Sequence, residues 1–219
     1  MTNRSEIENS LELKISKYAS FGRGLFELVS QDQGVELREG SLDRLELAWR
    51  VAAWVDYKID TGSLSRGEVA NLLINPEVSL LPVEYKKLSN LFPSREKFSR
   101  FILRAVRAIK ISENVSIINR HRESIYFAQA LVFSMCLSQA DETKMLKVIY
   151  KMSSAGNFID DVLDAGVDGT GFLLNLKKLG LFGKQFVKGL RALNSPIKVL
   201  FEFAKLTRKA RSLVENKED

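Results

Sequence analysis

Four aspartates lie close together in the stretch GNFIDDVLDAGVDG, residues 156–169. Asp160, Asp164 and Asp168 are spaced four residues apart, and Asp161 stands beside the first of them. On an α-helix this spacing puts the three on one face, where like charges repel by roughly 0.2–0.5 kcal/mol per pair. No lysine or arginine stands four residues away to offset that repulsion. A hard cation such as Mg²⁺, which takes carboxylate, water and phosphate oxygens, would do so. The stretch therefore predicts a metal site.

A second acidic pair has the same spacing. In WVDYKIDTG, Asp56 and Asp60 stand four residues apart at the end of a largely apolar helical pattern. The chain between the two acidic stretches is long enough for a hairpin of helices, so both helix ends can face one cavity. We therefore expect the two stretches to hold a metal-bound diphosphate over an apolar pocket. The predicted metal ligands are Asp56, Asp60, Asp160, Asp161, Asp164 and Asp168.

The elements that must position these residues are helices. Apolar residues recur at spacings of three and four almost throughout, alternation is scarce, and the four prolines fall at joints. This pattern predicts an all-α fold, with residues 1–219 forming one domain of about eight helices around a central cavity. The expected helices span about 42–60, 83–91, 95–111, 113–138, 142–169, 172–179, 182–193 and 196–215. The first has Ser41 as N-cap and Thr61-Gly62 as its stop, the third runs from the Ser94 cap to about Ile111, and the fifth is capped by Asp141 and ends by Gly169. The last is a basic C-terminal helix with Pro196 first. Pro76 and Pro82 should bracket a loop.

The composition of the chain says less about its binding partner than the motifs do. The 33 Lys and Arg residues outnumber the 27 Asp and Glu, for a net charge of +6. This excess suits an anionic partner, which could be nucleic acid, a membrane surface or a phosphorylated small molecule. The single cysteine, Cys136, excludes a disulfide framework and a cysteine cluster for zinc. No apolar run approaches the roughly 20 residues that span a bilayer, so we expect a soluble, cytoplasmic protein.

The motifs carry a family resemblance. NFIDDVLD resembles the second aspartate-rich motif of the trans-prenyl diphosphate synthases. DDVLDAGVD is similar to the metal-binding triad of class I terpene cyclases, whose ligands fall at the first, fifth and ninth positions, here Asp160, Asp164 and Asp168. DYKID, residues 56–60, resembles the shortened first acidic motif of squalene and phytoene synthase relatives. The likeness covers about residues 40–180 and points to the class I isoprenoid synthase superfamily.

The resemblance implies a helical bundle that binds a prenyl diphosphate through Mg²⁺ and ionises it to an allylic carbocation. The protein would then be a diphosphate lyase or transferase, that is, a terpene cyclase or a prenyltransferase. Catalysis would fall to Asp56, Asp60, Asp160 and Asp164. The diphosphate would meet basic residues, of which Arg120 and Lys177 rank before Arg122 and Lys178. The pocket would be lined by Trp54, Tyr57, Tyr126, Phe127, Asn157 and Phe158.

The same residues are compatible with other functions. The first motif has two aspartates where many relatives have three or more, and Val167 stands where a lysine is often found. A degenerate relative that binds diphosphate without turnover is therefore one alternative, and a non-catalytic helical binding module is another. DAGVDGTGFLLN also has a calcium-loop order, but Asn175 stands where the bidentate glutamate belongs. We expect a prenyl diphosphate rather than nucleic acid as partner, and the basic C-terminal helix is compatible with peripheral membrane contact. A homodimer is also compatible with the sequence.

Overall fold

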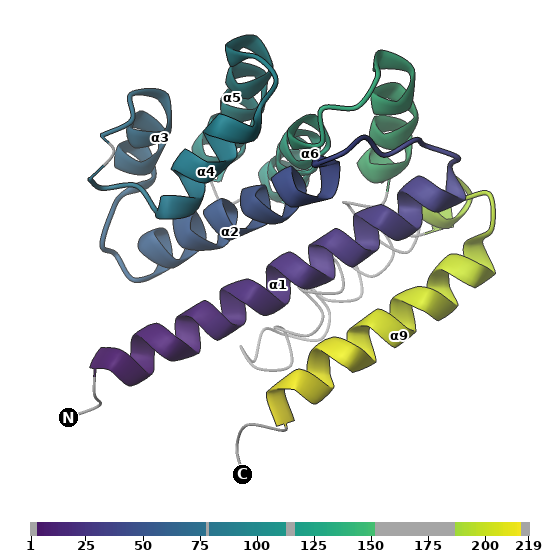
Figure 1. Cartoon of the computed structure of the whole chain (residues 1–219), viewed down its shortest axis with the longest axis horizontal. Coiled ribbons are helices and arrows are strands. Elements are labelled where there is room, and N and C mark those ends of the chain that lie inside the picture. Colours follow the sequence, from purple (N-terminus) through teal and green to yellow (C-terminus); the bar gives the residue numbers. More distant parts are fainter. Residues whose placement is uncertain (1–3, 78, 113–116, 152–186, 216–219) are drawn as a thin grey trace.

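The computed structural model describes residues 4–77, 79–112, 117–151 and 187–215. Every regular element within these ranges is helical, which confirms the all-α class for this part of the chain (Figure 1). The arrangement around a central cavity stays a prediction. The helices are α1 (Arg4–Asp32), α2 (Ser41–Asp60), α3 (Arg66–Ile74), α4 (Val83–Leu91), α5 (Arg95–Ile111), α6 (Ile117–Ser134) and α9 (Pro196–Glu215), with helical segments also at 139–151 and 187–190.

Several helix ends lie where the sequence predicts them. The Ser94 hydroxyl accepts from the backbone N–H of Lys97 at 3.3 Å and so caps α5, which runs to Ile111. Helix α4 spans the expected residues, and α9 begins at Pro196. Helix α2 stops at Asp60 because the chain turns through Gly62, whose φ of 65° is readily adopted by glycine. The acidic end of α2 is therefore a true helix end.

Two predicted caps are wrong. Ser41 is the first residue of α2 rather than its cap, and Gly40 takes the cap position with a φ of 71°. The Ser41 hydroxyl is buried and accepts from Arg44 instead. The helix after α6 begins at residue 139, with Ser138 as its cap, since the Ser138 hydroxyl accepts from the Asp141 N–H at 3.2 Å and donates to the Asp141 carboxylate at 2.7 Å.

One further helix end and two whole helices differ from expectation. Helix α6 ends at Ser134, four residues early, because Cys136 adopts a left-handed conformation with a φ of 54°. Helices α1 and α3 are not among the expected ranges. Helix α3 has a capping box, in which the Ser65 hydroxyl accepts from the Glu68 N–H while the Glu68 carboxylate accepts from the Ser65 N–H. This local signal explains why a short helix forms before Pro76.

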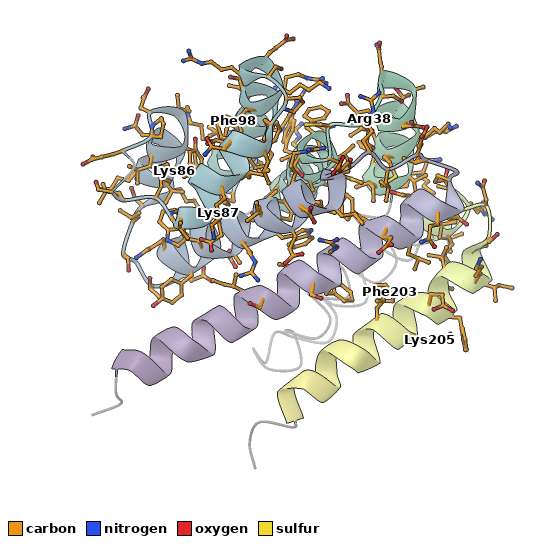
Figure 2. All side chains as sticks on the ribbon, viewed as in Figure 1. Arg38, Lys86, Lys87, Phe98, Phe203 and Lys205 are labelled. Carbon is orange, nitrogen blue, oxygen red and sulfur yellow. The ribbon has the colours of Figure 1, made fainter. Side chains whose placement is uncertain are left out.

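The described helices share one hydrophobic cluster. Helix α2 contacts α1, α3, α4 and α6, while α5 pairs with α6 and α9 runs beside α1 (Figure 1). Gly22 lets α1 approach α2 closely, because its α-carbon faces the indole of Trp49. Figure 2 marks Phe98 of α5, whose ring packs edge-on against Tyr85 and Phe92 at centroid distances of 5.5 and 5.1 Å. The largest fully buried side chains are Leu45, Leu88, Met135, Met145, Val29, Val69, Val132, Val148, Ser30, Ser41 and Ser134.

Arg44 is a charged residue of α2 that the fold buries. Its guanidinium donates to the carbonyl oxygens of Ser134 at 3.1 Å, Met135 at 3.0 Å and Leu91 at 3.4 Å. These carbonyls end α6 and α4, where helices leave acceptors without intrahelical partners and carry partial negative charge. Arg44 therefore closes two helix ends at once, and this explains a buried cation at this position.

Candidate functional site

The second acidic stretch lies outside the described residues. This applies to eight predicted site residues, namely Asn157, Phe158, Asp160, Asp161, Asp164, Asp168, Lys177 and Lys178. Their roles as metal, diphosphate and pocket residues therefore stay predictions. The remaining site residues fall on α2 and α6, where the structure shows what surrounds them.

The first acidic pair occupies the last turns of α2. Asp56 and Asp60 are both exposed, and the helix continues unbroken through Asp60, so their spacing places them on one face. The Thr61 hydroxyl donates to the carbonyl of Tyr57 at 2.8 Å and closes the final turn. Two exposed carboxylates on a rigid helix end can supply oxygen ligands to a hard cation whose other ligands are water or phosphate.

A lysine lies over the aromatic residues of the same helix end. The Lys58 ammonium is 6.0 Å from the ring centroid of Trp54 and 5.9 Å from that of Tyr57. Both rings are partly buried. A cation at this distance from a ring face is attracted by its quadrupole. The two predicted pocket aromatics of α2 therefore already contact a cation of the chain itself.

The pocket aromatics of α6 have other neighbours. Phe127 packs edge-on against Trp49 with a centroid distance of 5.2 Å, which places its ring at the junction of α2 and α6. Tyr126 instead faces the arginines of α5. Of the predicted diphosphate ligands on α6, Arg122 is exposed, whereas the side chain of Arg120 lies outside the described part. The structure thus groups Trp54 and Tyr57 with the acidic pair and gives Tyr126 a different set of contacts.

Sequence reasoning missed a row of arginines on α5. Arg107 stacks on the Tyr126 ring at 4.7 Å, Arg104 lies 5.7 Å from the same ring, and Arg100 stacks on Phe133 at 4.4 Å. Arg100 also forms an ion pair with Glu142 at 2.9 Å. None of the carboxylates that the structure describes pairs with Arg104 or Arg107. The spacing of three and four in RFILRAVR was the available signal, because it places these cations on one face.

The described residues limit what a metal at the α2 end could bind to. No group of three or more His, Cys, Asp or Glu side chains that could hold a metal occurs among them. Among the described helices, none is both long and apolar enough to cross a membrane. A metal site at the α2 end would therefore need ligands beyond Asp56 and Asp60, from water, from substrate or from residues 152–186.

Comparison of the chain with protein-family models, with curated proteins and with solved structures finds no match.

Proposed function

We propose that this protein is a Mg²⁺-dependent class I isoprenoid synthase, a terpene cyclase or prenyltransferase acting on an allylic prenyl diphosphate. The observation that carries the proposal is the spacing of Asp160, Asp164 and Asp168, which follows a first pair, Asp56 and Asp60, in the same helical chain. The exposed position of the first pair on the last turns of α2 supports it. The all-helical architecture of the described residues is also the one that the resemblance implies.

The predicted ligands are of the type that Mg²⁺ prefers. Carboxylates are hard oxygen ligands, and Mg²⁺ is commonly held by one or two of them together with substrate phosphates. When bound, Mg²⁺ would stabilise the negative charge that develops on the leaving diphosphate. Asp56 and Asp60 would hold the cation from the α2 end, and Arg122 is an exposed cation that could contact the diphosphate.

The direct test is release of diphosphate. The full chain is incubated with geranyl, farnesyl or geranylgeranyl diphosphate and Mg²⁺, and diphosphate is measured over time. We expect release with at least one substrate, and loss of release with Asp160→Asn or Asp164→Asn. Asp43→Asn is the matched control, since Asp43 is an exposed aspartate in the first turn of α2, far along the helix from Asp60.

The outcomes separate the proposal from its nearest alternative. Absence of release with all three substrates would overturn the synthase assignment. If Mg²⁺-dependent binding of the substrates were then still measured by calorimetry, a degenerate diphosphate-binding relative would remain. Equal loss of activity in Asp43→Asn would show that the effect is not specific to the acidic motifs.

The arginine row favours a second candidate function, a non-catalytic module that binds polyanions. Arginine donates to phosphate through two parallel hydrogen bonds, and stacking on Tyr126 holds Arg104 and Arg107 in place without neutralising them. This candidate predicts binding to a polyanion such as heparin that weakens with salt. It should survive Asp160→Ala and Asp164→Ala and be lost in the double variant Arg104→Gln, Arg107→Gln. The reverse result would eliminate the candidate.

A further inference from the structure

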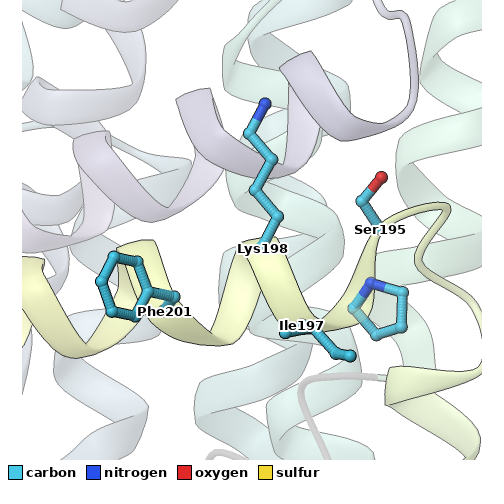
Figure 3. A pocket seen from close by; sticks show the side chains of 5 residues that line it. Ser195, Ile197, Lys198 and Phe201 are labelled. Atoms are coloured by element: carbon cyan, nitrogen blue, oxygen red, sulfur yellow. The ribbon is translucent and has the colours of Figure 1, made fainter.

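The beginning of α9 exposes large apolar side chains. Ile197 is 83% exposed and Phe201 is 63% exposed, and Leu200 and Val187 follow at 39% and 44%. Ser195, Pro196, Ile197, Lys198 and Phe201 line an apolar hollow here, around the first turns of the helix (Figure 3). We call residues 187–205 the α9 corner. Isolated exposed apolar residues are common, but Ile197 and Phe201 stand one turn apart on α9 and line the same hollow, which needs an explanation.

The opposite face of α9 already has its partner. Val199 is buried, and Phe203 packs edge-on against Phe21 of α1 with a centroid distance of 5.5 Å. Figure 2 shows Phe203 on the α1 side of α9 and Lys205 on the other side. Because Ile197 and Phe201 are four residues apart and two residues out of phase with Val199 and Phe203, they share the face that points away from α1. The protein's own core therefore does not use them.

The chain fixes this corner firmly. The Asp32 carboxylate, at the end of α1, accepts from the backbone N–H groups of Asn194 at 2.8 Å and Ser195 at 2.7 Å. The Asn194 side-chain amide also donates to the Asp32 carbonyl at 2.6 Å. These bonds tie the two residues that precede α9 to the end of α1. The apolar residues are thus displayed from a fixed helix.

The corner is basic. Lys188, Arg191, Lys198 and Lys205 are all exposed, whereas Glu202 is the one acidic residue between 187 and 205 and pairs with Lys205 at 2.8 Å. The Lys205 ammonium also lies 4.5 Å from the centroid of the Phe201 ring. Long basic side chains beside exposed apolar residues are the composition of helices that lie in the interface of a bilayer.

We infer that the α9 corner docks on the surface of an anionic lipid bilayer, with Ile197 and Phe201 inserted at the headgroup boundary and the basic residues against lipid phosphates. The charge of the corner matches that surface and disfavours a second copy of the same corner, which would bring like charges together. Helix α9 also lies at the edge of the molecule, where a flat surface can reach it (Figure 1). Apolar insertion and basic attraction together supply the two signals that stable peripheral binding requires. This inference does not rest on the synthase proposal.

Cosedimentation with vesicles tests it. The full chain is mixed with vesicles of phosphatidylcholine alone, or of phosphatidylcholine and phosphatidylglycerol in equal parts. We expect binding to the mixed vesicles, weakened by added salt, and little binding to phosphatidylcholine alone. The double variant Ile197→Ser, Phe201→Ser should bind the mixed vesicles about tenfold or more weakly, because two apolar side chains no longer insert. Leu103→Ser is the matched control, since Leu103 is 61% exposed on α5, and it should bind like the wild type.

Each contrary result is decisive. No binding of the wild type to the mixed vesicles overturns the inference, as does equal binding by the wild type and the Ile197→Ser, Phe201→Ser variant. If gel filtration instead shows a wild-type dimer that this variant dissociates, without vesicle binding, the corner is an interface between copies. Diphosphate release is assayed without vesicles, so failure of the synthase proposal and failure of this one are read separately.

Discussion

The contact between Gly22 and Trp49 gives a sharp prediction about how α1 and α2 are held together. A Cβ at Gly22 would overlap the indole, with Cδ1 at 2.7 Å and Nε1 and Cε2 closer still. The indole cannot retreat freely, because it also packs edge-on against Phe127. Gly22→Ala should gain about 1 kcal/mol of helix propensity and lose about 1–3 kcal/mol through overpacking, so the net change destabilises or is near zero. Urea unfolding followed by far-UV circular dichroism measures the change in free energy.

Two other glycine variants isolate the packing effect. Gly67 of α3 has nothing within 4 Å of its added Cβ, so Gly67→Ala should gain helix propensity without a clash. This variant should therefore unfold at a higher urea concentration than the wild type. Gly24 is the control on α1 itself, where the added Cβ meets only the flexible end of Leu206 at 3.0 Å. We expect the order Gly67→Ala, then Gly24→Ala, then Gly22→Ala, from most to least stable. A Gly22→Ala midpoint as high as that of Gly67→Ala would refute the close packing of α1 on α2.

Three further predictions concern helix ends. Arg44→Met should lower the free energy of unfolding by about 3 kcal/mol, because two buried carbonyls and one partly buried carbonyl lose a charged donor; a denaturant midpoint within error of the wild type would contradict this. Asp32→Ala should lower the free energy of unfolding by about 1 kcal/mol and speed amide hydrogen exchange at Asn194 and Ser195, just before α9, since their N–H groups lose their acceptor; unchanged exchange at these two positions would contradict it. Hydrogen bonds from the Ser65 hydroxyl and N–H hold the pKa of Glu68 below its ordinary 4.5, so this cap stabilises the fold above that pH and is lost as the pH falls through the lower folded value. The stability difference between wild type and Glu68→Gln should therefore shrink in acid, and a constant difference between neutral and acidic pH would refute it.

Local signals predicted the parts of the fold that local chemistry decides. Ser94 caps α5 because a serine hydroxyl satisfies an N–H at the helix start wherever the chain folds. The end of α2 at Asp60 follows in the same way from the glycine that comes after it. The predicted caps at Ser41 and Asp141 failed for different reasons. Packing buries Ser41 next to Arg44, so its hydroxyl does not cap α2. At the later helix both Ser138 and Asp141 offer a side-chain oxygen, and Ser138, which stands earlier, is the one that caps.

The rest depends on contacts between helices, which no local pattern encodes. Arg44 looks like a surface residue until α4 and α6 end beside it. Arg104 and Arg107 look like a solvated face until α6 brings Tyr126 against them. At the candidate site the spacing of Asp56 and Asp60 correctly predicted that they share a face of α2, but no local pattern showed that Lys58 lies over the neighbouring rings.

Lys58 also bears on how the two acidic stretches would share a metal. Its ammonium stands between Asp56 and Asp60 in the sequence, in the last turn of α2, where a cation is favoured by the helix dipole. The α2 end thus carries a partial counterion of its own, whereas the stretch 160–168 has no Lys or Arg four residues from its aspartates. A divalent cation gains most where the carboxylates are least compensated, so Asp160→Asn and Asp164→Asn should weaken Mg²⁺ binding more than Asp56→Asn and Asp60→Asn in calorimetric titrations. An equal or larger loss at the α2 pair would show that Lys58 offsets little of the charge of Asp56 and Asp60.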